Sequence, residues 1–199
     1  HPQVLIATDD MYEHILWSDE PFCNILNACP DLYEQTIVLN GVSKAYAMTG
    51  WRIGYAGGPA DLIKAMKKIQ SQSTSNPTSI SQVAAQAALG GDQSCIQPML
   101  KAFHERHDYV VAELNKMPGV NCLPADGTFY CFPHVQPVID RLDGVNNDVE
   151  LAEHLLETAG VALVPGSAFG APGYVRFSFA TGMDVLTEAL TRLNRALTA

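Results

Sequence analysis

The stretch GVSKAYAMTGWRIG, residues 41 to 54, places one lysine and one arginine among small residues, with glycine at both ends. The run TIVLNGV before it (36 to 42) is apolar and β-branched, which predicts a buried strand that ends just before Ser43 and Lys44. A lysine at the end of such a strand is accessible and partly desolvated, so its amine is a candidate Schiff-base nucleophile. The alternatives are an exposed surface lysine and, for Arg52, a surface ion pair instead of a phosphate or carboxylate contact.

Strand-like and helix-like segments alternate on both sides of this stretch. VLIAT (4 to 8) predicts a strand that ends at Asp9 and Asp10, and RIGYAGGP (52 to 59) predicts a third strand. Helical spacing predicts helices at about 60–71, 79–89, 93–116, 148–159 and 184–197. The alternation is typical of an α/β protein with a largely parallel sheet.

The pattern of predicted elements changes at residue 117, after the long predicted helix. Short strand-like runs then follow, namely VNCL, TFYCF, VALV and YVRFSFA. We therefore predict two domains, residues 1–102 and residues 103–199, the second containing the end of the long helix.

Three side chains of different chemistry are predicted to converge. In an open α/β sheet the ligand crevice lies outside the carboxyl ends of the strands, which is where Asp9 and Lys44 fall, and Arg52 follows Lys44 by eight residues. An acid for a ring nitrogen, a lysine for an aldehyde and an arginine for a phosphate are the anchors that pyridoxal phosphate requires.

Composition excludes several other classes of function. Twelve Lys and Arg against twenty-one Asp and Glu give a net charge of −9, which argues against nucleic acid and anionic membrane partners. No apolar run approaches the roughly 20 residues that span a bilayer. Five cysteines without a CxxC pair favour neither a disulfide framework nor zinc, and fit a reducing cytoplasm. His104 and His107 lie one turn apart without a third ligand, so we expect surface histidines and no metal site.

Four ordered motifs resemble one family. SKAYAMTGWRIGYAGGP (43 to 59) looks like the lysine motif of the fold type I, class I/II pyridoxal-phosphate aminotransferases. IATDDMYEHI (6 to 15) resembles the family's strand that ends in Asp-acid-x-Tyr, and VALVPGSAFG and GYVRFSFA resemble its C-terminal signature. The resemblance implies the C-terminal half of that fold, with a mostly parallel large-domain sheet and a small α/β C-terminal domain. The family's Gly-rich phosphate loop and ring-stacking aromatic are expected to precede His1.

The resemblance also implies a role for each matching residue. Lys44 would form the Schiff base and move the proton between substrate and cofactor, and Asp9 would pair with the pyridinium nitrogen. Tyr12 would bind the cofactor's phenolic oxygen and Arg52 its phosphate, while Arg176 would clamp the substrate α-carboxylate. The family often carries a phosphate-binding serine two or three residues before the lysine, where this chain has Gly41 and Val42. Ser43 is expected to replace it. Asp10 is expected to play a supporting or helix-capping role.

The implied activity is ping-pong transfer of an amino group from an amino acid, first aspartate and also aromatic or prephenate-type substrates, to 2-oxoglutarate. A cytoplasmic homodimer is implied as well. Two alternatives stay open: another enzyme of the fold, such as a carbon-sulfur lyase or aromatic aminotransferase, and a non-catalytic aminotransferase-like regulator domain. Gly166 and Phe169 in PGSAFG are expected to form either a mobile substrate-side loop or an ordinary turn.

Overall fold

The computed structural model describes residues 1–198. The chain divides into two compact units, His1–Leu100 and a second that begins at Lys101. This division lies close to the end of the first domain predicted at residue 102. The long helix α4 (Ile96–Leu114) runs through the division.

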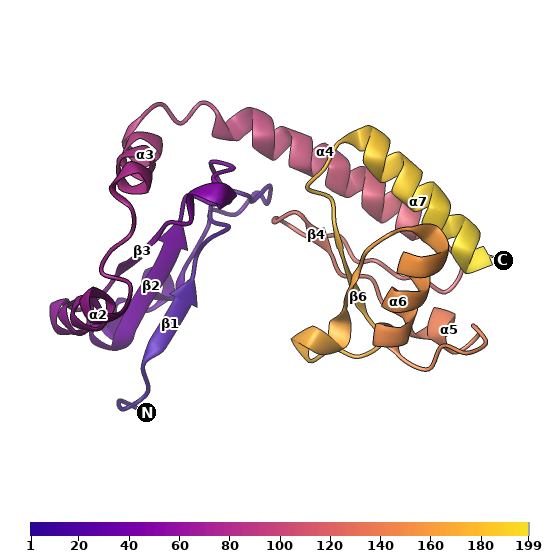
Figure 1. The fold of residues 1–199 in the computed structure, drawn as a ribbon, viewed down its shortest axis with the longest axis horizontal. Helices are drawn as coiled ribbons and strands as arrows, with labels where there is room; N and C mark the ends of the chain where they lie inside the picture. The colour runs from indigo at the N-terminus through magenta and orange to yellow at the C-terminus, as the bar shows by residue number, and fades with distance from the viewer. Residues whose placement is uncertain (199) are drawn as a thin grey trace. The chain divides into compact units, whose positions relative to one another are not determined.

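Unit 1 is built on a three-stranded sheet of β1 (Ile6–Asp9), β2 (Thr36–Gly41) and β3 (Gly54–Gly57), in that spatial order (Figure 1). β1 and β2 run parallel, whereas β2 and β3 run antiparallel. The expectation of a largely parallel sheet is therefore met in only one of these two pairings. The segment between β2 and β3 contains only the short 3-10 helix η2 (Thr49–Trp51), and a parallel crossover needs a longer connection.

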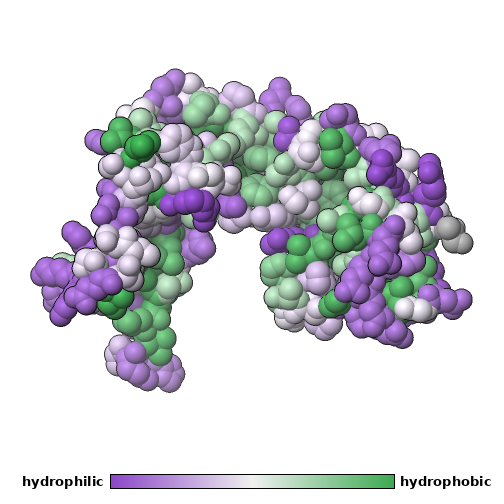
Figure 2. All heavy atoms as spheres, viewed as in Figure 1, coloured by the Kyte–Doolittle hydropathy of each residue, from purple (hydrophilic) through white to green (hydrophobic). Residues whose placement is uncertain are grey.

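The central strand β2 is the most buried of the three, and the outer strands are not buried on both faces. Val4 and Leu5 are 51% and 65% exposed and precede β1, so the predicted buried strand at 4–8 is wrong for these two residues. Figure 2 shows apolar side chains at the visible surface in the region of β1. An outer strand has a hydrogen-bonded neighbour on one side only, which explains its greater exposure.

Helices of unit 1 follow the predicted ranges closely. They are α2 (Ala60–Ser73) and α3 (Ser79–Gly90), with α4 two to three residues shorter at each end than predicted. Sequence patterns predict neither α1 (Ile25–Ala28) nor the 3-10 helix η1 (Pro30–Gln35). A side-chain cap starts α1, because Asn24 Oδ1 accepts from the N–H groups of Leu26 and Asn27.

Unit 2 contains a small antiparallel sheet in the order β4-β6-β5. Its elements are β4 (Tyr130–Cys131), α5 (Gln136–Ile139), α6 (Asp148–Ala159), β5 (Val164–Pro165), the 3-10 helix η3 (Gly166–Phe169), β6 (Val175–Ser178) and α7 (Met183–Thr198). The predicted strand VNCL is reduced to a single bridge between Asn121 and His134.

The core of unit 2 lies against α6 and α7, which pack side by side (Figure 1). α7 buries a leucine stripe at helical spacing, made of Leu186, Leu190, Leu193 and Leu197. α6 adds Leu151 and Leu155 from its own buried face. The two helices thus contribute leucine side chains to the core of unit 2.

His107 is not the surface histidine that we predicted. It is 3% exposed, its Nε2 accepts from the Ala125 N–H at 2.9 Å, and its ring lies 6.0 Å from that of Phe179. Its burial depends on chain segments far away in the sequence. Within residues 1–198 the structure contains no group of three or more side chains able to hold a metal ion. Among the same residues, no helix has the length and apolar character to cross a membrane.

Candidate functional site

One end of the sheet in unit 1 gathers the residues singled out in the sequence. Because β1 and β2 are parallel, Asp9 and Gly41 close these strands at the same end, and Figure 1 shows both arrowheads pointing there. Gly41 pairs with Gly54 at the start of antiparallel β3, so the connecting loop 42–53 lies at this end too. Lys44 and Arg52 both belong to that loop.

Lys44 lies above an aromatic ring. Its Nζ is 5.9 Å from the centroid of the Tyr12 ring, and both side chains are half-buried. The backbone around Lys44 is a turn in which its carbonyl accepts from the Ala47 N–H at 3.2 Å. Ser43 lies in the same turn and is half-buried. The turn brings an amine, a hydroxyl and a phenol into one neighbourhood.

Two consecutive aspartates have different surroundings. Asp10 is 5% exposed and accepts from the Thr8 hydroxyl at 2.7 Å and from Asn24 Nδ2 at 2.9 Å. Asp9 is exposed, and its Oδ1 accepts from the Met11 N–H at 3.2 Å. Asp10 is therefore occupied in holding the chain after β1, and Asp9 has the carboxylate that a ligand can reach.

Asp9 also borders a pocket of about 600 Å³ between the sheet and α2. Tyr55 lines it, and burial together with the nearby carboxylate of Glu13 raises the pKa of the Tyr55 phenol. Tyr12, Ser43, Lys44 and Arg52 do not line this pocket.

Arg52 occupies a left-handed backbone position with φ 49°. Its Nη1 donates to the Thr49 carbonyl at 2.8 Å, and the side chain is exposed. The residue before it, Trp51, is fixed from α3, because the buried Ser81 hydroxyl donates to the Trp51 carbonyl at 2.7 Å. α3 thus holds the backbone next to Arg52.

Arg176 belongs to unit 2, on β6. Its Cζ lies 4.4 Å from the Tyr130 ring centroid and 4.8 Å from the Phe169 ring centroid. No acidic side chain of residues 1–198 forms an ion pair with it. The guanidinium therefore packs against aromatic rings, and no carboxylate of the described residues occupies its N–H groups.

The loop that carries Phe169 is a tight turn, which is one of the two forms expected for it. A Cβ on Gly166 would lie 2.3 Å from the Ala171 carbonyl oxygen, so only glycine fits. The Ser167 N–H donates to the Asp148 carboxylate at 2.7 Å, and Asp148 is 2% exposed.

Sequence reasoning missed Asp148, and it did not predict that the Tyr130 and Phe169 rings contact Arg176. For Asp148 a signal existed, because an acid follows the Asn147 cap of α6. Burial favours a higher pKa for Asp148, but hydrogen bonds from Ser167, from Gly173 and from the Asp148 backbone together outweigh burial and lower the pKa.

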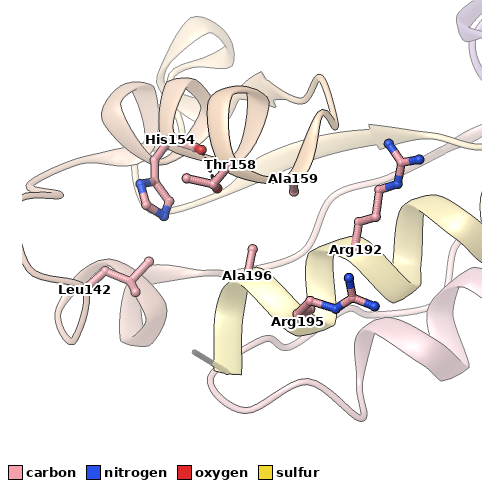
Figure 3. Close-up of a pocket in the computed structure, with 7 residues that line it drawn as sticks. All are labelled: Leu142, His154, Thr158, Ala159, Arg192, Arg195 and Ala196. Atoms are coloured by element: carbon pink, nitrogen blue, oxygen red, sulfur yellow. Dashed lines mark hydrogen bonds between the residues drawn. The ribbon is translucent and has the colours of Figure 1, made fainter.

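A second pocket of about 600 Å³ lies between α6 and α7 (Figure 3). Its lining consists of Leu142, His154, Thr158, Ala159, Arg192, Arg195 and Ala196. Arg192 Nε donates to Glu188 at 2.7 Å, and the lining offers neither a lysine nor a carboxylate. None of the predicted site residues borders this pocket, so its chemistry does not match that expected of the site.

Comparisons with known proteins all lead to aminotransferases. The family model described as aminotransferase class I and II matches residues 1–193. An aspartate/prephenate aminotransferase of Nitrosomonas europaea is 60% identical over 97% of this chain and 50% of the relative. An aspartate aminotransferase of Geobacillus stearothermophilus is 45% identical over 98% of this chain and 50% of the relative.

Solved structures give the same result. The aspartate aminotransferase of Rhizobium meliloti matches with a TM-score of 0.94 at 46% identity, over 100% of this chain and 50% of that one. An aromatic aminotransferase of Pyrococcus horikoshii matches with a TM-score of 0.88 at 35% identity, over 98% and 51%. The chain thus spans about half the length of the curated relatives it matches.

Proposed function

Because the chain belongs to the class I and II aminotransferase family, we propose that it forms part of a pyridoxal-phosphate enzyme that moves an amino group from an amino acid to a 2-oxo acid. The observation that carries this proposal is the common location of Asp9, Lys44 and Arg52 at one end of one sheet. Since the chain spans about half of its relatives, the activity is proposed for the whole protein.

The side chains of unit 1 fit the chemistry of the cofactor. Pyridoxal phosphate presents a ring nitrogen, a phenolic oxygen, an aldehyde and a phosphate. Unit 1 supplies an accessible carboxylate at Asp9, a phenol at Tyr12, an amine at Lys44 and a guanidinium at Arg52. When bound, the cofactor supplies an electron sink that stabilises negative charge at the substrate α-carbon.

Each of these residues would do a separate task. The Asp9 carboxylate would hold a proton on the ring nitrogen, since an adjacent negative charge favours the protonated form. Tyr12 would donate to the phenolic oxygen, and Arg52 and the Ser43 hydroxyl would bind the phosphate. The Lys44 amine would hold the aldehyde between turnovers and then take the proton from the substrate α-carbon as general base.

Arg176 would bind the substrate α-carboxylate through its planar fork of N–H groups. The absence of an acidic partner for it among residues 1–198 supports this role. A guanidinium that already holds a carboxylate would have to exchange it for the substrate.

Aspartate and 2-oxoglutarate are the first substrates to test, because several relatives are named for aspartate. Aromatic or prephenate-type substrates are the second candidate. The rings of Tyr130 and Phe169 beside Arg176 favour them, as do the names of two relatives.

The proposal includes a cytoplasmic homodimer. Exposed apolar side chains near α3 support association, with Ile80 and Val83 being 70% and 66% exposed and Trp51 43%. The five free cysteines are compatible with a reducing compartment.

Borohydride trapping of the lysine–cofactor linkage in the full-length protein, followed by peptide mapping, tests the proposal. We expect the label on Lys44, and Lys44→Ala should lower turnover by roughly 10²- to 10⁴-fold, as loss of a general acid–base typically does. Label on Lys64, Lys67 or Lys68 alone would overturn the assignment. Amino-group transfer from aspartate supports the proposed activity. Cleavage of a carbon-sulfur substrate without transfer would favour a lyase, and bound cofactor without turnover would favour a regulator domain.

A further inference from the structure

We propose that Tyr130 and Phe169 are positioning residues that hold the Arg176 guanidinium ready for a carboxylate. The proposal rests on the carboxylate-binding role proposed above for Arg176. Its basis is the position of the Arg176 Cζ over two rings at once, 4.4 Å from the Tyr130 centroid and 4.8 Å from the Phe169 centroid.

Strand register places Tyr130 and Arg176 on the same face of the small sheet. Tyr130 pairs with Ser178, two residues beyond Arg176, so the two side chains are diagonal neighbours. The opposite face carries Cys131, Val175 and Phe177, all of which are buried. The face that bears Tyr130 and Arg176 is therefore the one turned away from the core of unit 2.

Phe169 reaches the same guanidinium from η3, and its backbone is held at several points. The Gly166 N–H donates to the Tyr174 carbonyl at 2.7 Å, and the Ser167 N–H donates to Asp148. Gly170 then ends the turn with φ 74°. This backbone is tied to α6 and to the residue just before β6, although the Phe169 ring itself is 51% exposed.

Further rings support Phe169 from the side. Phe132 meets Phe169 edge-on, with centroids 6.0 Å apart, and stacks on Tyr174 at 5.2 Å and 11°. The Phe169 ring therefore has a fixed neighbour besides Arg176, which restricts the positions it can take.

Two rings suit a substrate-binding arginine better than an acid would. A ring attracts the guanidinium through its face and leaves the N–H groups at the edge available. An acidic partner would occupy those N–H groups and compete with the substrate. An arginine that is already ordered also loses less rotamer freedom when a carboxylate binds.

The expected signature is therefore in substrate binding and not in proton transfer. Removing one ring should raise the KM for both the amino acid and the 2-oxo acid by roughly 3- to 30-fold, the range of one cation–π contact. The kcat should stay within about twofold, because Lys44 and the groups around it are untouched.

The test compares Tyr130→Leu and Phe169→Leu with the ring-retaining variants Tyr130→Phe and Phe169→Tyr in the full-length enzyme. We expect the leucine variants to show the higher KM and the ring-retaining variants to restore it. Tyr109→Leu is the matched control, because Tyr109 is a tyrosine of the same unit whose hydroxyl contacts Thr187. Thermal unfolding of every variant is measured alongside.

If Tyr130→Leu does not fold, Phe169→Leu alone tests the positioning role, because the exposed Phe169 ring contributes little to the core. A parent-like KM in Phe169→Leu, together with a raised KM in Arg176→Ala, would overturn the positioning role alone. An unchanged KM in Arg176→Ala would overturn the proposed role of Arg176 itself. A KM that rises equally in Tyr109→Leu would show a general packing effect and would also overturn the positioning role.

Discussion

Asp9 and Asp10 are adjacent in the chain, but Asp10 is 5% exposed and accepts hydrogen bonds from Thr8 and Asn24, whereas Asp9 is exposed and its carboxylate accepts from the Met11 N–H. Asp9 is the last residue of β1, and Asp10 follows the strand, where Thr8 and Asn24 bind its carboxylate. One acid is thereby committed to structure, and its neighbour stays available for chemistry.

The asparagine variants of the two acids should separate these roles. In the full-length enzyme Asp9→Asn should lower kcat by roughly tenfold or more, equivalent to about 1.4 kcal/mol, and leave the unfolding temperature nearly unchanged. Asp10→Asn should lower the free energy of unfolding by about 1–3 kcal/mol, because it weakens a buried hydrogen-bond network. Steady-state kinetics and denaturant unfolding measure both effects. The opposite ranking would place the cofactor contact on Asp10.

Ser81→Ala should weaken cofactor binding from a distance. Ser81 is 4% exposed and donates to the Trp51 carbonyl at 2.7 Å, next to Arg52. Its loss leaves a carbonyl without this donor, at a cost of about 1–3 kcal/mol in stability, and loosens the backbone that presents Arg52. Cofactor titration and thermal unfolding check the two effects. The exposed Ser79, at the start of α3, supplies the control Ser79→Ala, which should change neither.

Asp148→Asn should make the free energy of unfolding less dependent on pH in the acidic range. Burial of Asp148 opposes ionisation, but hydrogen bonds from Ser167, from Gly173 and from the Asp148 backbone together lower its pKa below the ordinary value of 3.8. A lowered folded-state pKa contributes stability that is complete above the unfolded value and is lost as pH falls through the folded value. Asp148→Asn should therefore be less stable than the parent at pH 7, by about 1–3 kcal/mol.

The difference in unfolding free energy between parent and Asp148→Asn should shrink below about pH 4, where the Asp148 carboxylate of the unfolded parent begins to take up a proton. Denaturant unfolding measured at pH 7 and at steps down to pH 3 gives the comparison. The exposed Asp143 offers the control Asp143→Asn. A difference that is constant across this range would show that the Asp148 charge contributes nothing.

Thiol labelling should divide the cysteines into two groups. Cys23, Cys29 and Cys95 are exposed, whereas Cys122 and Cys131 are buried. A hydrogen bond with Cys122 and burial raise the pKa of Cys131, and the same bond lowers that of Cys122, which stays 2% exposed. A polar thiol reagent should react quickly with the three exposed thiols and with the other two only after unfolding. Equal rates for all five would contradict the buried pair.

Local signals explain which elements could be predicted. The range predicted for α6 agrees with the observed Asp148–Ala159, because Asn147 caps its start and Gly160 ends it in a left-handed conformation. Strands β4 and β5 are only two residues long, shorter than the predicted runs TFYCF and VALV. Local sequence does not predict the length of a strand well, because that length depends on partner strands elsewhere in the chain. The same reason applies to Val4 and Leu5, whose apolar character does not reveal the absence of a second neighbouring strand in unit 1.

The predicted site divides in the same way. Lys44 and Arg52 share a loop, and Asp9 ends a strand paired with the one before that loop, so sequence position was enough to predict a common end of the sheet. These residues keep their proposed roles. The contacts of Arg176 could not be predicted, because Tyr130 and Phe169 reach it only through the pairing of β4 with β6 and the folding of η3.

The left-handed backbone of Arg52 has a consequence for attempts to make this protein more heat-tolerant. A non-glycine residue in that conformation costs about 1–2 kcal/mol, and glycine or asparagine adopts it more readily. A library selected only for survival at high temperature would therefore accept Arg52→Asn or Arg52→Gly as neutral or improved. The same clones would have lost the proposed phosphate contact. Selection of this kind needs a cofactor-binding step, or it will enrich stable proteins that no longer hold the cofactor.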